Sequence, residues 1–268
     1  MELGTEKILK LASVTKLYKN GRGVTDISFS LAPGEVLGLL GPNGSGKTTT
    51  MKAIAGLVHP SAGSIHICGV NAYEHHEEAM KYVGALIEAP ALYEHLTAYD
   101  NLRLAARFYK NVGSERIDEV LRMVDMSSYK KDKVSTFSLG MRQRIGLALA
   151  LLSEPKLLIL DEPANGLDIE GMLYVRDVIK AASDKGSAVL ISSHLAGEIQ
   201  QCATKAAVIH SGRLLAIKSM DEILADFESL EAFFLSEVEK SRREDFRSLT
   251  KTGSKEPPAG TGQGGEAL

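Results

Sequence analysis

The sequence predicts an α/β fold with a mainly parallel sheet, and three observations point to it. Short aliphatic runs without polar alternation, at Val36–Leu40, Leu157–Leu160 and Ala188–Ser192, are typical of strands that helices cover on both faces. Segments with helical start signals separate these runs, so strand and helix alternate along the chain. A chain of 268 residues with 44% hydrophobic content is also long enough to bury a large core.

The first part of the chain has a different pattern. Ile8–Tyr18 and Val24–Leu31 are expected to be paired strands of an antiparallel N-terminal β subdomain. The turn residues Pro33 and Gly34 end this unit just before the first strand of the parallel sheet.

A helical subdomain is expected over about residues 75–152. Thr97 and Asp100 resemble a capping box at the start of one helix. Ser114 is placed to cap a second helix, whose apolar face is formed by Ile117, Val120, Leu121 and Val124. We therefore expect this region to be a helical insertion in the α/β core.

The C-terminal region divides into three parts. Leu214–Ile217 predicts a last strand of the main domain, which spans residues 1–225. Asp221–Leu249 predicts helix, so residues 226–252 form a helical extension. Residues 253–268 hold five glycines and two prolines with little apolar content, and we expect this tail to be disordered.

The most informative motif follows the Val36–Leu40 strand and has the form G-x-x-x-x-G-K-T. Its members, together with the residue after it, are Gly41, Pro42, Asn43, Gly44, Ser45, Gly46, Lys47, Thr48 and Thr49. Glycines let the backbone bend so that successive N–H groups point inward, and the helix beginning near Lys47 adds its positive end. Lys47 is long enough to reach the β- and γ-phosphates, and Thr48 offers a hydroxyl ligand for Mg²⁺. The alternative is a glycine-rich turn, but a strand before the motif and a helix after it favour a P-loop NTPase core that binds a nucleoside triphosphate with Mg²⁺.

A second pair of functional residues follows the Leu157–Leu160 strand. Asp161 and Glu162 come at the carboxyl edge of the sheet, where nucleotides bind in open α/β folds. We expect Asp161 to hold Mg²⁺ and Glu162 to orient the water that attacks the γ-phosphate. The alternative interpretation is a solvated strand end before Pro163.

Composition argues against several classes of protein. The net charge of −3 disfavours a general nucleic-acid binder. Cys68 and Cys202 are the only cysteines and lack metal-ligand spacing, which indicates a reducing compartment. The sequence predicts neither a secretory signal nor an apolar run long enough to cross a bilayer.

Four further motifs, in order along the chain, resemble those of the ATP-binding subunits of ABC transporters. They are Tyr18, placed like the residue that stacks on adenine; Ser138–Arg144, similar to the family signature; Ala164–Asp168, similar to the loop after the catalytic carboxylate; and Ser192–His194, similar to the switch histidine segment. The resemblance covers roughly residues 8–225.

The resemblance implies a catalytic site shared between two chains. Ser138 and Gly140 of one subunit would face the phosphate loop of the other, and Glu162 and His194 would be the catalytic residues. Because this chain carries one set of motifs, it would pair with a second ATPase subunit, most simply a copy of itself. It would drive separate integral membrane permease subunits, and so be cytoplasmic and peripheral on the inner face of the cell membrane.

Two departures from the family pattern stand out. The signature has Leu139 and Met141 where many relatives have glycine and glutamine, while Ser138 and Gly140 are retained. Glu88 takes the place of a glutamine that usually contacts Mg²⁺, so we expect Glu88 to be a metal ligand. An exposed loop carboxylate without such a role is the alternative.

The segment Val83–Tyr93, with Glu88 in place of the glutamine, resembles the same segment in the bacterial subfamily that exports antimicrobial peptides such as bacitracin and lantibiotics. Export of another cargo (a drug, lipid, polysaccharide or ion) remains open. So do a non-transport ABC ATPase working on ribosomes or in cluster assembly, and a non-hydrolysing regulatory subunit. The single cassette and mild acidity disfavour the non-transport ATPase. The presence of Lys47, Asp161, Glu162 and His194 disfavours the non-hydrolysing subunit.

Overall fold

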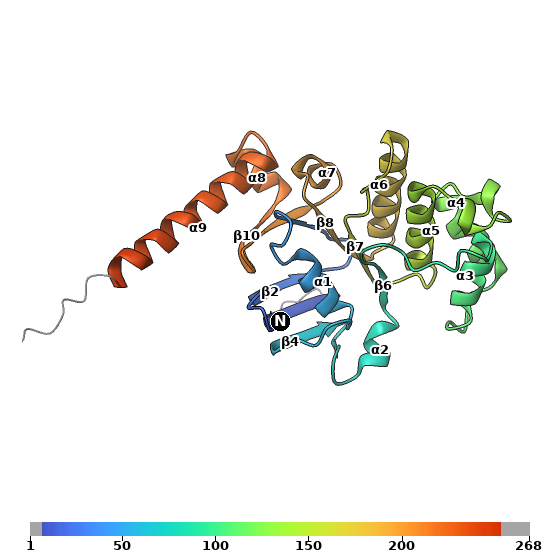
Figure 1. The fold of residues 1–268 in the computed structure, drawn as a ribbon, viewed down its shortest axis with the longest axis horizontal. Helices are drawn as coiled ribbons and strands as arrows, with labels where there is room; N and C mark the ends of the chain where they lie inside the picture. Colours follow the sequence, from blue (N-terminus) through green and yellow to red (C-terminus); the bar gives the residue numbers. More distant parts are fainter. Residues whose placement is uncertain (1–6, 253–268) are drawn as a thin grey trace, which may run out of the picture.

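The computed structural model describes residues 7–252, and the tail predicted to be disordered lies outside these described residues. Within them the strands form two sheets, one of four strands and one of six. Figure 1 shows helices α3, α4 and α5 grouped at one end of the molecule, while α9 extends away from the other end. None of the helices in this described range combines the length and apolar character that crossing a bilayer requires.

The smaller sheet is antiparallel and begins the chain. It has the strand order β2-β1-β4-β5. Its strands are β1 (Leu9–Leu17), β2 (Gly23–Leu31), β4 (Ala62–Ile67) and β5 (Val70–Asn71). Leu9 pairs with Leu31 on one side and with Ile67 on the other, and all three are buried. This apolar face is covered by the core, so the predicted N-terminal β subdomain is confirmed.

The larger sheet is parallel except at one edge. It has the order β10-β9-β3-β8-β7-β6, and only β10 runs antiparallel to its neighbour. Its strands are β3 (Val36–Leu40), β6 (Val83–Leu86), β7 (Leu157–Asp161), β8 (Ala188–Ser193), β9 (Lys205–His210) and β10 (Arg213–Ser219). Every residue of β3, β7 and β8 is buried, as expected for strands covered on both faces.

The helices surround this sheet and connect its strands. They are α1 (Lys47–Ile54), α2 (His76–Met80), α3 (Ala98–Ala106), α4 (Ser114–Met123), α5 (Leu139–Leu151), α6 (Ile169–Asp184), α7 (Ala196–Gln200), α8 (Met220–Asp226) and α9 (Leu230–Thr252), with short 3₁₀ turns at Ser127–Tyr129 and Val134–Thr136. The Thr97 side chain accepts a hydrogen bond from the Asp100 N–H, so the predicted cap of α3 is confirmed.

Alternate residues of the central strands enter two different apolar cores. Leu37 and Leu39 of β3 pack between the large sheet and the antiparallel sheet. Val36 and Leu40 pack on the opposite face, in a core that α3, α4, α5 and α6 share. Because neighbouring side chains of a strand point to opposite faces, the two cores hold the sheet between them.

Three details differ from the sequence predictions. Val83–Leu86 forms β6 at the edge of the large sheet, within a stretch that we expected to be helical. Gly113, not Ser114, is the N-cap of α4, and Ser114 is its first residue. The region 221–249, which we expected to be helical, contains two helices, α8 and α9, and residues Phe227–Ser229 lie between them. The division of the chain at residues 225 and 252 stays a prediction.

Candidate functional site

The loop between β3 and α1 has a backbone that requires glycine. Gly44 and Gly46 have φ angles of 79° and 114°, in the left-handed region that side chains disfavour. A Cβ atom on Gly41 would lie 2.2 Å from the carbonyl oxygen of Ile209. Gly46 is also the N-cap of α1, so the loop ends at the positive end of that helix. The backbone therefore has the form that an anion-binding loop needs.

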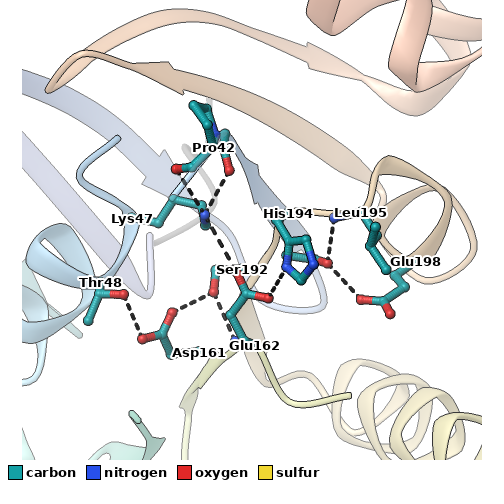
Figure 2. Close-up of polar contacts among 11 residues, drawn as sticks. Pro42, Lys47, Thr48, Asp161, Glu162, Ser192, His194, Leu195 and Glu198 are labelled. Atoms are coloured by element: carbon teal, nitrogen blue, oxygen red, sulfur yellow. Dashed lines mark hydrogen bonds and ion pairs between the residues drawn. The ribbon is translucent and has the colours of Figure 1, made fainter. Parts of the chain in front are cut away.

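The ammonium group of Lys47 lies inside this loop (Figure 2). Lys47 is only 5% exposed, and its Nζ donates hydrogen bonds to the carbonyl oxygens of Gly41 at 2.7 Å and Pro42 at 3.5 Å. The same Nζ lies 3.5 Å from Glu162 Oε1. A buried cation held by carbonyls and one carboxylate is well placed to bind an incoming polyanion.

Asp161 connects the phosphate loop to the neighbouring strand. It ends β7, is 5% exposed, and pairs in register with Ser192 of β8. Its Oδ2 accepts a hydrogen bond from Thr48 Oγ1 at 2.8 Å, and its Oδ1 accepts one from Ser192 Oγ at 2.6 Å. The Ser192 hydroxyl in turn accepts from the backbone N–H of Glu162 at 2.9 Å. Thr48 and Asp161, both predicted metal ligands, are thus in direct contact (Figure 2).

Glu162 and His194 face each other across the carboxyl ends of β7 and β8. His194 Nδ1 lies 2.6 Å from Glu162 Oε2. An ionised carboxylate can only accept a hydrogen bond, so the ring N–H is the donor in this contact. Glu162 has a φ of 50°, so its backbone is held in the left-handed region. Ser193 supports the next turn, because its hydroxyl donates to Glu198 Oε2 at 2.6 Å and accepts from the Leu195 N–H at 3.0 Å.

Lys47, Thr48, Glu162 and His194 line one open cavity of about 400 Å³, whereas Asp161 is not among its lining residues. Its walls are Tyr18, Asn20, Arg22, Gly23, Asn43, Gly44, Ser45, Gly46, Lys47, Thr48, Thr49, Glu162, Asn165 and His194. Ser45 is 3% exposed, and its hydroxyl has no hydrogen-bond partner within residues 7–252. A phosphate oxygen is the kind of acceptor that satisfies such a group, so the residues present fit a nucleotide.

The cavity also contains residues that we did not single out. Asn20 and Arg22 follow Tyr18 in the hairpin turn, where the N–H of Tyr18 donates to the carbonyl of Arg22. The signal that could have found them is their place beside the predicted adenine-stacking residue. Asn165 lies in the loop after Glu162, within a motif that we had named without giving this side chain a role.

Glu88 does not line this cavity. Its Oε1 pairs with Lys52 Nζ at 2.6 Å, and its side chain is 62% exposed. Lys52 lies on α1, four residues beyond Thr48. Within the described part of the chain, no three His, Cys, Asp or Glu side chains cluster closely enough to hold a metal. Glu88 as a ligand stays a prediction.

The signature residues also lie outside the cavity lining. Ser138 is the N-cap of α5, and its hydroxyl accepts from the Met141 N–H at 3.3 Å. The Leu139 side chain lies over Gly166, where a Cβ atom would be 2.8 Å from Leu139 Cδ2. The leucine at this signature position is therefore accommodated by the glycine of the loop after Glu162. Ser138 is exposed and Gly140 is half-buried.

Comparison with known proteins agrees with this geometry. A model of the ABC transporter family matches residues 24–165. YhcH of Bacillus subtilis (strain 168), an uncharacterized ABC transporter ATP-binding protein, is 44% identical over 216 residues, which is 80% of this chain and 71% of that protein.

Other relatives are named for the cargo that they transport. The bacitracin transport ATP-binding protein BcrA of Bacillus licheniformis is 38% identical, covering 87% of this chain and 77% of that protein. The lantibiotic transport ATP-binding protein SrtF of Streptococcus pyogenes is 36% identical, covering 86% of this chain and 97% of that protein. A solved structure of the ATP binding subunit of an ABC transporter aligns with a TM-score of 0.79 at 30% identity, over 86% of this chain and 99% of that one. The chain therefore belongs to the ABC transporter family, as an ATP-binding subunit with ATPase activity.

Proposed function

We propose that this subunit pairs with a second ATPase subunit on binding ATP and drives a separate membrane permease that exports an antimicrobial peptide. The observation that carries the proposal is the division of the predicted site within the chain. Lys47, Glu162 and His194 share one cavity, while the Ser138 end of α5 lies outside its lining. A second copy in head-to-tail arrangement would place its Ser138 over this cavity and complete the site.

The residues in and beside the cavity divide the chemistry among them. The loop N–H groups and Lys47 bind the phosphates. Thr48 and Asp161, with Glu88 as a further candidate, would hold Mg²⁺, which would supply positive charge to neutralise the phosphate oxygens. Glu162 orients and polarises the attacking water, and His194 holds the Glu162 carboxylate through its Nδ1 contact of 2.6 Å.

An apolar groove supports the permease as partner. Its volume is about 330 Å³, and it is lined by Ala91, Tyr93, Asn101, Leu104, Ala105, Phe108, Tyr109 and Leu149. Phe108 is 86% exposed and Tyr93 54%, which is unusual for aromatic side chains of a protein without a partner. We assign this groove to a short amphipathic helix from a cytoplasmic loop of the permease. The subunit would then sit at the inner face of the membrane.

The cargo is proposed from the relatives. Relatives at 38% and 36% identity are named as bacitracin and lantibiotic transport ATP-binding proteins. Export of another cargo is the second candidate, because relatives at 44% identity have no named cargo. The two are separated by expressing this subunit with its own permease in a sensitive host. Protection against bacitracin or a lantibiotic that is lost in the Glu162→Gln variant supports peptide export, and unchanged sensitivity contradicts it.

The dimer is tested with Glu162→Gln, which keeps the shape of the side chain and removes its charge. We expect this variant to bind ATP, to lose turnover and to form an ATP-dependent dimer in size-exclusion chromatography with light scattering. Glu228→Gln, at an exposed glutamate outside the cavity, is the matched control and should turn over ATP like the parent. A Glu162→Gln protein that hydrolyses ATP at the parent rate, or stays monomeric with saturating ATP, refutes this role.

A further inference from the structure

The segment between β6 and α3, residues 87–97, lines part of the groove and also contacts α1, because Glu88 pairs with Lys52. It carries Tyr93, a wall of the groove. The buried Asn101 holds the backbone of Tyr93 from both sides: its Oδ1 accepts from the Tyr93 N–H at 2.8 Å, and its Nδ2 donates to the Tyr93 carbonyl at 3.1 Å. Asn101 thereby anchors the backbone of a groove-wall residue directly before Glu94.

Glu94 is tied to the segment that leads to the signature. Its carbonyl oxygen accepts from the Ser135 N–H at 2.9 Å. Its carboxylate Oε1 accepts from Arg142 Nη1 at 2.5 Å. The same guanidinium group donates through Nε to the carbonyl oxygen of Phe137 at 3.3 Å. Phe137 directly precedes Ser138, the N-cap of α5.

Arg142 thus contacts Glu94, which follows the groove wall, and Phe137, which precedes the signature serine. One side of its planar fork holds the residue next to the groove wall, and another holds the peptide group that sets the backbone of Ser138. A guanidinium group can donate in two fixed directions at once, whereas a lysine ammonium group is a point charge without that geometry. The backbone N–H of Arg142 also donates to the Ser138 carbonyl at 3.0 Å, an ordinary bond of the first turn of α5 that does not depend on the arginine side chain.

We propose that Arg142 is a positioning residue that couples occupancy of the groove to the placement of Ser138, and so to closure of the ATP-bound dimer. This inference rests on the proposed dimer and permease contact. Arg142 and Glu94 are 32% and 59% exposed, so solvent weakens their pair. Loss of this pair alone should weaken the ATP-driven dimerisation constant by about twofold to fivefold. Loss of the Phe137 contact as well should change it more.

The test uses the full chain in the Glu162→Gln background, which prevents turnover. The sequence has no tryptophan, so Tyr18→Trp places a single fluorescent reporter in the cavity. This reporter measures ATP affinity at dilute, monomeric protein, and light scattering measures the ATP-driven dimerisation constant. A defect confined to dimerisation separates positioning of Ser138 from general destabilisation, which would also lower ATP affinity and the unfolding midpoint.

Arg142→Gln should weaken ATP-driven dimerisation by about fivefold or more while ATP affinity of the monomer stays unchanged. Arg142→Lys should not restore the parent value. Glu94→Gln should show a smaller loss, which disappears when it is added to Arg142→Gln, because the two residues act through one contact. The control Arg103→Gln removes an exposed arginine that pairs with Asp100 elsewhere on the helical end.

The possible failures are distinguishable. If the Glu162→Gln, Tyr18→Trp parent forms no dimer with ATP, the proposed dimer is refuted and the role of Arg142 with it. If that parent dimerises but Arg142→Gln matches Arg103→Gln, only the coupling role is overturned. Additive losses in the double variant, or a parallel loss of ATP affinity, overturn it equally.

Discussion

Lys47 illustrates how single residues of the site are held before a ligand arrives. Its ammonium group is nearly buried, yet its contacts are two carbonyl oxygens and one carboxylate at 3.5 Å. A lone buried charge would be costly, so these acceptors stabilise it in place. Because the longer contacts to Pro42 and Glu162 are weak, they are readily exchanged for phosphate oxygens.

Replacing Lys47 by alanine should therefore weaken ATP binding by at least about tenfold, since a charge-assisted hydrogen bond contributes roughly 1.5–3 kcal/mol. Fluorescence titration of the Tyr18→Trp protein measures this affinity. Lys180→Ala removes an exposed lysine on α6 and should leave the affinity unchanged. An unaltered affinity in Lys47→Ala would count against the site.

At the scale of elements, β6 shows why a short segment joins the sheet. Val83–Leu86 pairs only with β7, at the sheet edge. Gly84 permits α5 to approach, because a Cβ atom there would lie 1.9 Å from the carbonyl oxygen of Ala150. The absence of a side chain, and not an apolar pattern, is what allows the strand to pack at this place.

Gly84→Ala should accordingly lower the free energy of unfolding by about 1–3 kcal/mol, as backbone atoms must shift to admit the methyl group. Gly197→Ala is the comparison, because it lies in α7 with no atom within 4 Å of the added Cβ. That change should be neutral or stabilise by up to about 1 kcal/mol. Urea unfolding of both variants measures the difference in stability. Equal unfolding midpoints would contradict the close approach of α5 to Gly84.

At the scale of the whole molecule, the cavity exists only because distant parts of the chain meet. The hairpin turn with Tyr18, the phosphate loop after β3, and the residues after β7 and β8 all contribute walls. Since the unfolded chain has no such cavity, a ligand bound there stabilises the folded state by mass action. The same logic applies to Mg²⁺, whose proposed ligands Thr48 and Asp161 are 113 residues apart in sequence.

Mg-ATP at about 100 times its dissociation constant should stabilise the Glu162→Gln protein by about 2.7 kcal/mol, raising its melting temperature by roughly 5–10 °C. Differential scanning fluorimetry measures the shift. The same ATP with excess chelator should give a smaller shift, and Lys47→Ala should give little. Equal shifts with and without Mg²⁺ would argue against the metal ligands.

Agreement between sequence and structure depends on how local each feature is. The strand ending at Leu40, the glycine-dependent loop and the Thr97 cap depend on neighbouring residues, and the structure has each of them where predicted. The cap of α4 was misplaced by one residue, since Gly113 and Ser114 are both acceptable before a helix. The catalytic and metal roles of Glu162, His194 and Glu88 stay predictions.

The sequence by itself determined the α/β class and the phosphate loop, because strand periodicity and glycine backbone freedom act over a few residues. Only the tertiary structure decided that β6 completes the sheet edge, that Glu162 meets His194, and that Glu88 pairs with Lys52. These are contacts between residues far apart along the chain. Their partners are chosen by how helices and strands pack, which no local pattern of residues specifies.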